Sequence, residues 1–469
     1  MTKAQILVPS VRIGDAVGEH TFQLCRVLRR RYDEVTILTN DAPGPLPPDM
    51  TEAVRRVKPH HLEQAILTIV QYPLWFPLAE RVRDMAGARI FWYHGVTPPD
   101  LWGSQRDVEL LRDSQVRTAL AWHAHLAVTA SPFTARELHE SCGYPEERIR
   151  VIPLPVDVSA FAAPPGEQAL AELRQRWGLE GRRVLLFIGR IAGNKRIDLL
   201  IQAMARLKTS HPDLILLVVG DDRYNAAAQE LARTFAQQVR ELGLDDRVIF
   251  TGRVESVVPY LHLADAFLLP SQHEGFGAPL VEAMAAGVPV IASASGAMPW
   301  VLAAENNDDG EPAGILFTPG DVDDLVNQIT RLLDEPGLAQ ALVERGRIRA
   351  RDFEPDLFAR NALDAVDEAV ALRAEPTPFN AMLGQTLYPQ ADIAIHDYQV
   401  RSNAPLVGPL IEWTRTQMTS HLKEPYIDRI VARQVRYNQM LASELDYLHA
   451  QLRQIESQIE ALREEENDR

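Results

Sequence analysis

The stretch EGFGAPLVEAMAAGVPVIAS, from Glu274 to Ser293, decides the fold of this chain. It follows an apolar segment typical of a buried strand, DAFLLPS at 265–271, and passes through a glycine-rich turn into a helical pattern. Such a turn presents backbone N–H groups to a phosphate in α/β proteins. Glu274 lies at the turn and Glu282 about two helical turns further on. Carboxylates so placed can accept hydrogen bonds from hydroxyl groups at the two ends of a sugar nucleotide; the alternative is a helix start with two solvated glutamates.

A second stretch, VLLFIGRIAGNKRIDLLIQAMARL at 184–207, repeats the order of strand, loop and helix. Arg190 follows the apolar strand pattern, and Lys195 precedes a helix whose apolar residues recur at helical spacing. Cations near a helix N-terminus are unfavourable unless an anion joins them. The pattern therefore predicts that Arg190 and Lys195 meet an anion, with two ordinary surface cations as the alternative.

Together, the Glu-x7-Glu spacing around Gly-Phe-Gly and the upstream Arg and Lys resemble the retaining glycosyltransferases of family 4, which have the GT-B fold. In that family the Arg and the Lys, here Arg190 and Lys195, contact the donor diphosphate. The first Glu, here Glu274, contacts hydroxyl groups of the donor sugar, and the second, here Glu282, holds the ribose. The resemblance also implies donor or acceptor contacts from further backbone positions: Gly275, Phe276, Gly277, Val254, Gly14 and Gly18.

Two features of the N-terminal half bear on the same site. His94 ends the apolar segment RIFWYHG at 89–95, so we expect it to face the donor site across a crevice. The resemblance implies that it contacts the donor sugar near its reacting carbon, whereas a packed loop residue is the alternative. The loop RIGDAVGEH at 12–20 departs from the family, in which adjacent glycines are common at this place, although Gly18 still fits the turn.

Apolar segments alternate with helical patterns along most of the chain, which favours parallel, doubly wound sheets. This pattern predicts an α/β protein, and the resemblance to family 4 implies the GT-B type, with two Rossmann-like domains facing a cleft. The first, an acceptor domain, is predicted at 1–160 and is completed by a crossing helix at 352–372. The second, a nucleotide-sugar donor domain, is predicted at 161–351.

The C-terminal region is predicted to be an addition to this fold, because its composition changes after residue 372. A proline-containing linker at 373–405 leads to an amphipathic helix and coiled-coil tail at 406–469. In the tail, apolar residues alternate in steps of four and three: Leu441, Leu445, Leu448, Leu452, Ile455, Ile459 and Leu462. This heptad pattern predicts a homo-oligomer through 441–462, with packing onto the catalytic domains as the alternative.

No metal site is predicted. His123 and His125 form a His-x-His pair, but no carboxylate or cysteine cluster lies nearby in the sequence, so ordinary surface histidines are the expected interpretation. Asp321 and Asp323 resemble a metal-binding pair of transferases. They directly precede a helical pattern, so helix capping explains them better.

Composition limits the remaining classes. The net charge of −16 excludes a nucleic-acid footprint, and only Cys25 and Cys142 are present, which indicates a reducing compartment. We expect a cytoplasmic protein, because no signal peptide is recognisable and no apolar run approaches about 18 residues. A basic cluster, Arg26 with 29–31, leaves weak peripheral contact with the inner membrane face open.

The resemblance implies transfer of a hexosyl group from a UDP- or GDP-linked sugar to a hydroxyl acceptor, with retention of configuration and without cofactor or metal. The acceptor is expected to be a glycan, a lipid-linked molecule or a small molecule, in cell-surface polysaccharide or glycoconjugate biosynthesis. Two alternatives stay open at this point. One is a non-catalytic GT-B scaffold that acts through its coiled coil, and the other is a GT-B sugar-nucleotide epimerase.

Overall fold

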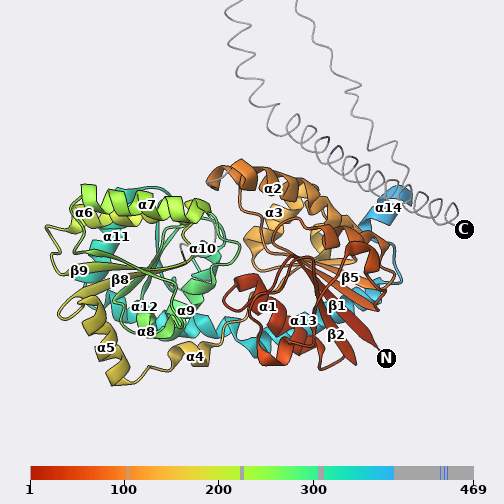
Figure 1. Ribbon diagram of the computed structural model, residues 1–469, viewed down its shortest axis with the longest axis horizontal. Coiled ribbons are helices and arrows are strands. Elements are labelled where there is room, and N and C mark those ends of the chain that lie inside the picture. Colours follow the sequence, from red (N-terminus) through yellow and green to blue (C-terminus); the bar gives the residue numbers. More distant parts are fainter. Residues whose placement is uncertain are drawn as a thin grey trace, which may run out of the picture.

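The computed structural model describes residues 2–102, 105–221, 226–304 and 311–384, together with Gln434, Asn438 and Leu441. The predictions for the tail at 406–469 and for most of the linker lie outside the described residues. Two parallel sheets with helices around them make up the described part (Figure 1).

The first sheet has seven strands in the order β3-β2-β1-β4-β5-β6-β7, all parallel. Its strands are β1 Lys3–Val8, β2 Glu34–Thr39, β3 Val54–Arg56, β4 Leu67–Tyr72, β5 Ala88–Tyr93, β6 Leu126–Thr129 and β7 Ile149–Val151. The order changes direction between β1 and β4, so this pair marks the topological switch point at which ligands of such sheets bind.

The second sheet has six strands in the order β10-β9-β8-β11-β12-β13, again all parallel. Its strands are β8 Arg183–Ile188, β9 Leu214–Val219, β10 Val248–Gly252, β11 Ala266–Leu269, β12 Val290–Ser293 and β13 Ile315–Phe317. Here the switch point lies between β8 and β11. The two sheets confirm the expected α/β class with two Rossmann-like domains.

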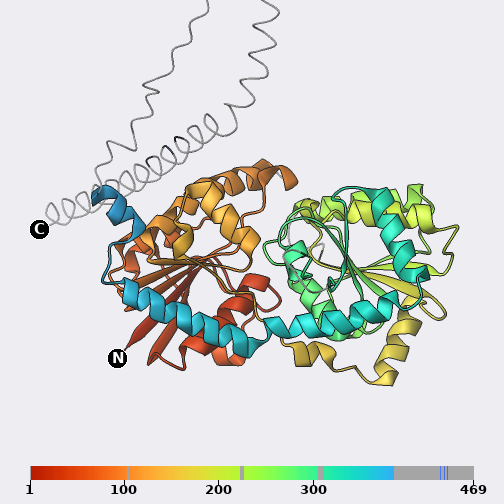
Figure 2. The same cartoon turned by 180° about the vertical axis from the view of Figure 1, so that it is seen from behind.

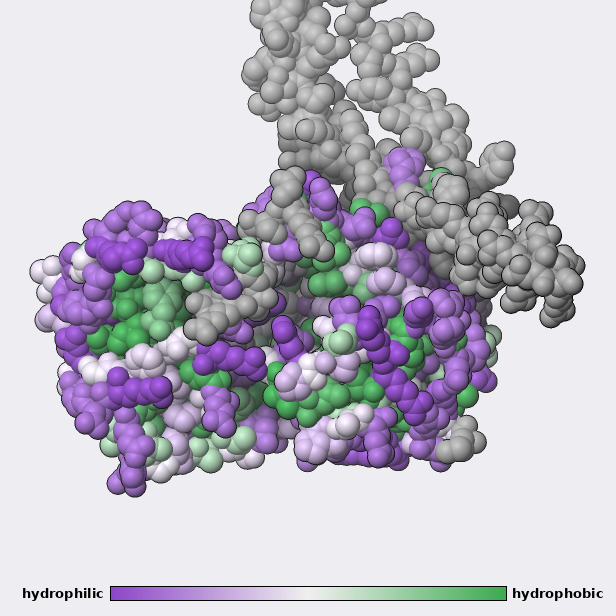
Figure 3. All heavy atoms as spheres, in the orientation of Figure 1, coloured by the Kyte–Doolittle hydropathy of each residue, from purple (hydrophilic) through white to green (hydrophobic). Residues whose placement is uncertain are grey.

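Helices enclose both sheets. They are α1 Ala16–Leu28, α2 Gln105–Val116, α3 Pro132–Cys142, α4 Val158–Ala162, α5 Glu167–Trp177, α6 Ile197–Leu207, α7 Ala226–Glu241, α8 Val258–Leu261, α9 Ala278–Ala286, α10 Met298–Val301, α11 Val322–Asp334, α12 Leu338–Ala350, α13 Pro355–Leu372 and α14 Pro378–Gly384. Hydrophilic residues gather along α7, where the second domain meets solvent (Figure 3). Short 3-10 helices, among them η4 Pro99–Leu101, η5 Arg117–His123 and η7 Gly193–Lys195, complete the connections.

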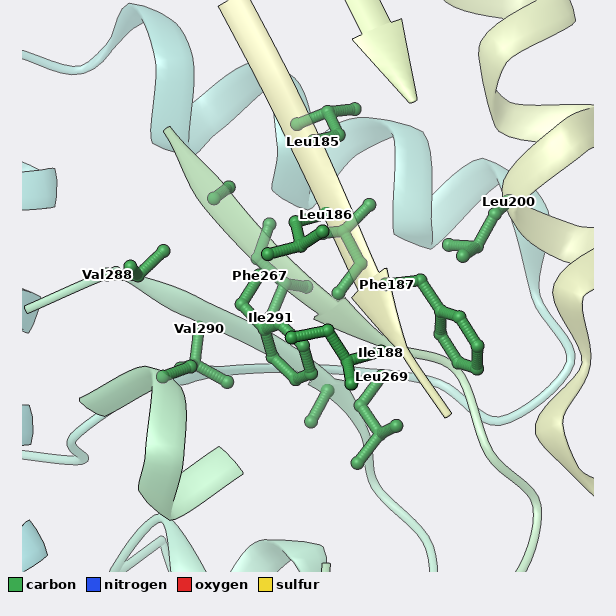
Figure 4. Close-up of a cluster of buried hydrophobic side chains, with 14 of the residues drawn as sticks. Leu185, Leu186, Phe187, Ile188, Leu200, Phe267, Leu269, Val288, Val290 and Ile291 are labelled. Carbon is green, nitrogen blue, oxygen red and sulfur yellow. The ribbon is translucent and has the colours of Figure 1, made fainter. Parts of the chain in front are cut away.

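The core of the second domain shows why its strands are apolar throughout. Every residue of β9, LILLVV, is buried, as expected for a parallel strand that is covered on both faces. Leu186, Phe267 and Ile291 bring β8, β11 and β12 into one cluster, which Figure 4 shows from close by. This core fixes the loops that follow β8 and β11 in space.

Helix α13 returns the chain to the first domain. Its buried side chains, including Phe358, Ala362 and Val366, belong to the same core as α1 and the first sheet, and Figure 2 shows the helix lying along that domain. The prediction of an uninterrupted helix at 352–372 is wrong at its start. A 3-10 turn at Arg351–Phe353 comes first, Glu354 is extended, and α13 begins at Pro355. Proline fits the first turn of a helix and disfavours a helical residue before it, which explains the break. The domain limits at 160 and 351 stay a prediction.

Candidate functional site

The two motifs of the second domain meet at its switch point. The loop after β8 carries Arg190 and Lys195, and the loop after the neighbouring β11 carries Glu274 and the glycines before α9. Backbone bonds join the loops, since the N–H of Gln272 donates to the carbonyl of Asn194 at 2.8 Å. The amide Nδ2 of the buried Asn194 donates in turn to the carbonyl of His273 at 3.2 Å. The structure therefore brings two motifs that are far apart in sequence into one rigid pair of loops.

Lys195 and Glu274 form an ion pair at the centre of these loops, with Nζ donating to Oε1. Both side chains are largely buried, with 15% and 13% of their surface exposed. Burial works against ionisation of Glu274, but the ammonium of Lys195, with smaller effects from Ser271 and His273, lowers the pKa of this carboxyl overall. The main chain of Glu274 is held as well, because the N–H of Ala297 donates to its carbonyl at 2.9 Å.

The start of α9 offers backbone N–H groups in the form expected for an anion site. Gly277 precedes the helix with a φ of 89°, in the left-handed region that favours glycine, and no side chain caps the helix there. Phe276 is buried against Phe353, with ring centroids 5.3 Å apart, and this packing holds the turn in place. Within the first turn Pro279 has no N–H, and the N–H of Leu280 donates to the carbonyl of Gly277 at 2.9 Å, so the N–H of Ala278 is the helix donor that follows Glu274 and Gly275 most closely.

Glu282 lies in the same helix and is only partly exposed. Burial raises the pKa of its carboxyl to about 7. Ligand groups that donate hydrogen bonds to this carboxyl would stabilise its charged form. Val254, which follows β10, is partly buried and packs against the core of the second domain.

The first domain contacts the Glu274 loop directly. The hydroxyl of Ser131 donates to the carbonyl of Gly275 at 2.7 Å, and His273 Nε2 lies 3.0 Å from Glu137 Oε1. Glu137 also accepts a bond from the hydroxyl of Tyr93 at 3.0 Å. A Cβ atom on Gly275 would lie 2.3 Å from the carbonyl oxygen of His94, so only glycine permits this approach. The sequence patterns predicted neither Ser131 nor Glu137.

The loop after β8, which carries Arg190 and Lys195, also contacts the first domain. The guanidinium of Arg190 lies over the ring of Trp102, 5.8 Å from its centroid. A Cβ atom on Gly193 would lie 2.7 Å from the carbonyl oxygen of Leu101. The indole of Trp102 is itself held, since its N–H donates to Asp107 at 3.0 Å. This contact places the guanidinium of Arg190 where the two domains meet.

His94 follows β5 and faces the second domain through its main chain, as described for Gly275. Its imidazole is partly exposed, and Nε2 contacts the amide oxygen Oε1 of Gln71, at the end of β4. Burial lowers the pKa of His94 to about 3, so the ring is neutral at ordinary pH. The structure therefore places His94 at the domain contact, close to the loop of Glu274.

Of the predicted loop at Gly14 to Gly18, only the first part is a loop. Asp15 caps α1 by accepting the N–H of Gly18 at 3.0 Å, so the helix begins at Ala16 and includes Gly18. Glycine is required there because a Cβ atom would lie 2.6 Å from the carbonyl oxygen of Arg12. Gly14 has a φ of 80° and faces the second domain, where a Cβ atom would lie 3.4 Å from the guanidinium of Arg253.

The two histidines predicted at the surface are buried, so that prediction is wrong. His125 Nδ1 accepts the backbone N–H of Arg89 at 3.1 Å, and burial, with smaller effects from nearby arginines, lowers its pKa to about 4. His123 packs on Phe379 of α14, with ring centroids 4.3 Å apart. The capping role of Asp321 is confirmed, since its carboxylate accepts the N–H groups of Asp323 and Asp324. Within the described ranges no group of three or more His, Cys, Asp or Glu side chains is arranged to hold a metal ion.

Known proteins resemble this chain in both sequence and fold. The family described as "Glycosyl transferases group 1" matches residues 171–349, and "Glycosyltransferase Family 4" matches residues 17–160. The chain is 34% identical over 223 residues to 2-deoxystreptamine glucosyltransferase of Streptomyces kanamyceticus, covering 47% of this chain and 54% of that protein. It is 31% identical over 247 residues to the MMP alpha-(1->4)-mannosyltransferase of Mycolicibacterium hassiacum, covering 52% and 54%. The chain spans about half the length of these curated relatives.

Solved structures match across both domains. The crystal structure of Anabaena HepE in complex with UDP and glucose superimposes with a TM-score of 0.64 at 19% identity, covering 78% of this chain and all of that one. Sucrose-phosphate synthase from Thermosynechococcus elongatus gives 0.63 at 22% identity, covering 79% and all of that chain. The fold is thus the GT-B fold of two facing Rossmann-like domains. The chain belongs to glycosyltransferase family 4, and the resemblance that the motifs indicated is confirmed.

Proposed function

We propose that this chain transfers a hexosyl group from a UDP- or GDP-linked sugar to a hydroxyl acceptor, with retention of configuration and without a metal ion. The observation that carries the proposal is the Lys195–Glu274 ion pair at the switch point of the second sheet, beside the uncapped N-terminus of α9. A cation, a carboxylate and a helix start without a side-chain cap in one place suit a diphosphate joined to a sugar. The UDP and glucose named for HepE support the same class of donor.

Each group has a proposed role in this scheme. Arg190, Lys195 and the backbone of Gly275, Phe276 and Gly277 bind the diphosphate, and Val254 lies beside the base. Glu282 accepts hydrogen bonds from the ribose. A bound diphosphate competes with Glu274 for the ammonium of Lys195. The carboxylate of Glu274 then accepts hydrogen bonds from hydroxyl groups of the sugar. Gly14 and Gly18 keep the first-domain loop close to the transferred sugar and the acceptor.

The proposed mechanism uses the leaving group as the base. Glu274 is already paired with Lys195, so it is poorly suited to attack the sugar as a nucleophile. A front-face reaction instead passes the proton of the acceptor hydroxyl to the departing phosphate oxygen as the new glycosidic bond forms. Arg190, Lys195 and the N-terminus of α9 stabilise the charge that develops on that phosphate. The contacts between the domains exclude water, which limits hydrolysis of the donor.

The biological setting follows by analogy. We propose a role in polysaccharide or glycoconjugate biosynthesis, with a glycan, lipid-linked or small-molecule acceptor. The scaffold and the epimerase stay as alternatives. A scaffold would not need the ion pair and the uncapped helix to be kept together, and this observation favours the transferase.

Assembly and membrane contact also stay proposals. The homo-oligomer through 441–462 lies outside the described residues. Within the predicted basic cluster, Arg26 pairs with Asp49 at 2.8 Å and Arg31 with Asp367 at 2.7 Å. These pairs reduce the charge that the cluster can offer to anionic lipid. None of the described helices is long and apolar enough to span a membrane.

A thermal-shift screen tests the proposed donor class. We expect the melting temperature to rise with one of UDP, GDP or ADP and with its sugar conjugate, because a ligand that binds only the native state stabilises it. The shift should persist in EDTA, since the proposed site uses side-chain cations and backbone N–H donors in place of a metal. A chain that shows no shift with any of these nucleotides contradicts the transferase and favours the scaffold.

Nucleotide binding should release a proton near pH 7. The free carboxyl of Glu282 has its pKa raised to about 7, and ribose hydroxyls stabilise its charged form, so the pKa falls on binding. Affinity should therefore weaken as the pH drops below about 7, by up to tenfold per unit. Isothermal titration in buffers of different ionisation enthalpy measures the released proton.

The Glu282→Gln variant is the control for this linkage. The phosphate of the nucleotide still titrates when this variant binds it. The part of the pH dependence that the variant lacks is therefore due to Glu282. The same shift affects stability without ligand. Because the folded pKa lies above the unfolded value, the contribution of Glu282 is complete below about pH 4.5 and is lost as the pH rises through about 7. Identical proton release by the variant and the wild type would contradict the ribose role.

A further inference from the structure

A buried amide lies behind His94. Gln71 is completely buried at the end of β4, beside the switch point of the first sheet. Its Oε1 contacts two imidazoles, those of His94 through Nε2 and of His20 through Nδ1, the latter at 3.2 Å. The two rings lie edge to face with centroids 5.2 Å apart. One amide oxygen therefore joins a histidine of α1 to the histidine at the domain contact.

The inner part of the cluster, around Gln71 and His20, is buried. His20 is 2% exposed and lies 4.7 Å from the ring of Trp92 and 5.3 Å from that of Phe358, measured between centroids. Phe358 belongs to the crossing helix α13, so elements from both ends of the described chain hold the amide in place. A side chain so enclosed has little freedom to rotate, and its oxygen keeps a fixed direction.

The protonation states of His94 and His20 decide which ring nitrogen of His94 carries a hydrogen. Burial lowers the pKa of His94 to about 3 and that of His20 well below its usual value, with the neighbouring His94 adding to the effect on His20. Both rings are therefore neutral, and each carries one N–H. Since both contact a carbonyl oxygen, His94 carries its hydrogen on Nε2 and keeps a lone pair on Nδ1. In that tautomer Nδ1 can accept a hydrogen bond from a sugar hydroxyl.

We propose that Gln71 is a positioning residue that fixes the ring orientation and tautomer of His94 for the donor sugar, and that His20 holds Gln71 in place. This inference rests on the proposed function, because it assigns Gln71 to the histidine of that site. The amide belongs to the acceptor domain and touches none of the proposed donor-binding groups of the second domain, so it acts on the sugar through His94 and not on the nucleotide.

Kinetics separates this role from a structural one. Gln71→Leu removes the acceptor with a side chain of similar size, and we expect turnover of the donor to fall about 10- to 100-fold. The affinity for UDP or GDP, whichever the chain binds, should stay unchanged, because that site lies in the second domain. His20→Phe keeps the ring contacts and should lower turnover only several-fold.

A matched control is available on the opposite face of the same sheet. Gln5 is also completely buried, and its Nε2 donates to Thr68 at 3.0 Å, away from His94. Gln5→Leu should lower the melting temperature and leave turnover unchanged. If Gln71→Leu affects only stability in the same way, the positioning role is wrong, although the transferase stands as long as His94→Ala lowers turnover.

The Gln71→Glu variant provides a signature that packing alone does not produce. The carboxylate still accepts hydrogen bonds from the N–H groups of His94 and His20. Its negative charge raises the pKa of His94, whose other titratable neighbour is His20. Turnover should then be lost as the pH falls through the raised pKa, because the protonated ring has no lone pair on Nδ1. The wild-type enzyme should show no such loss in this range, and equal pH profiles would overturn the inference.

Nuclear magnetic resonance tests the tautomer without any activity. Imidazole ¹⁵N spectra, assigned with His94→Asn, should show neutral His94 with its hydrogen on Nε2, and this state should be lost in Gln71→Leu. A hydrogen on Nδ1 in the wild type would overturn the inference whatever the donor. If nucleotide binding is absent but the tautomer is as expected, the proposed function fails and the bond from His94 to Gln71 remains.

Discussion

Lys195→Ala is expected to lower turnover of the donor by about 10² to 10³, the usual cost of removing one group that stabilises developing charge. In the proposed mechanism the leaving diphosphate gains charge in the transition state, so the loss should fall mainly on kcat. Ground-state affinity for the nucleoside diphosphate should weaken less. Stopped or continuous assays of donor hydrolysis, combined with titration of the nucleotide, measure the two effects separately.

The control for Lys195→Ala must remove an ion pair without touching the site. Arg183 pairs with Asp213 at 2.6 Å at the amino end of β8, the opposite end from Lys195. Arg183→Ala should therefore lower stability slightly and leave turnover unchanged. A second effect should accompany Lys195→Ala, because the pKa of Glu274 rises once its cation is gone. Turnover of Lys195→Ala within a few-fold of the wild type would remove the diphosphate role.

The fold could be predicted because its signals are local. Buried parallel strands such as β8 and β9 are continuous apolar runs, and a glycine follows each of them directly. Short elements gave no such signal. β3 and β13 have three residues each, too few to show any periodicity, and their place in the sheets depends on neighbours elsewhere in the chain.

The site could be predicted only in part. The groups after β8 and β11 share motifs with fixed spacing, and the structure brings them together at the switch point. Ser131 and Glu137 act across the domain contact, on residues more than 130 positions away in the sequence, so no local pattern marks them. Gln71 gave no signal either, because a polar residue at a strand end has many interpretations until its two histidine neighbours are seen.

Environment, not residue type, explains the errors. The surface position predicted for His125 rests on the lack of a carboxylate or cysteine cluster nearby in the sequence, yet the N–H of Arg89 satisfies one of its nitrogens and the ring is buried. The loop position predicted for Gly18 rests on its match to the turn of the resembling family, yet it lies in the first turn of α1, where the carbonyl of Arg12 leaves no space for a Cβ atom. In both cases a contact with another segment, invisible to spacing, decided the position.

Gly296→Ala is expected to lower turnover by about 10², through a shift of Glu274 by about 1 Å. Gly296 has a φ of 61°, and a Cβ atom there would lie 2.6 Å from the carbonyl oxygen of Glu274 and 2.8 Å from its nitrogen. Backbone atoms cannot rotate away as a side chain can, so the loop itself must move. The bond from the N–H of Ala297 to Glu274 passes that movement on to the ion pair with Lys195.

Gly243→Ala separates this displacement from backbone strain. Gly243 has nearly the same φ, 59°, but nothing lies within 4 Å of its Cβ position. Both variants should therefore lose stability from placing alanine in the left-handed region. Gly296→Ala should lose more, because of its backbone contacts, and only this variant should also lose turnover. Melting temperatures and donor hydrolysis measured on both variants give the comparison. Equal turnover of the two would show that the position of Glu274 does not control the reaction, because the strain is shared and the displacement is not.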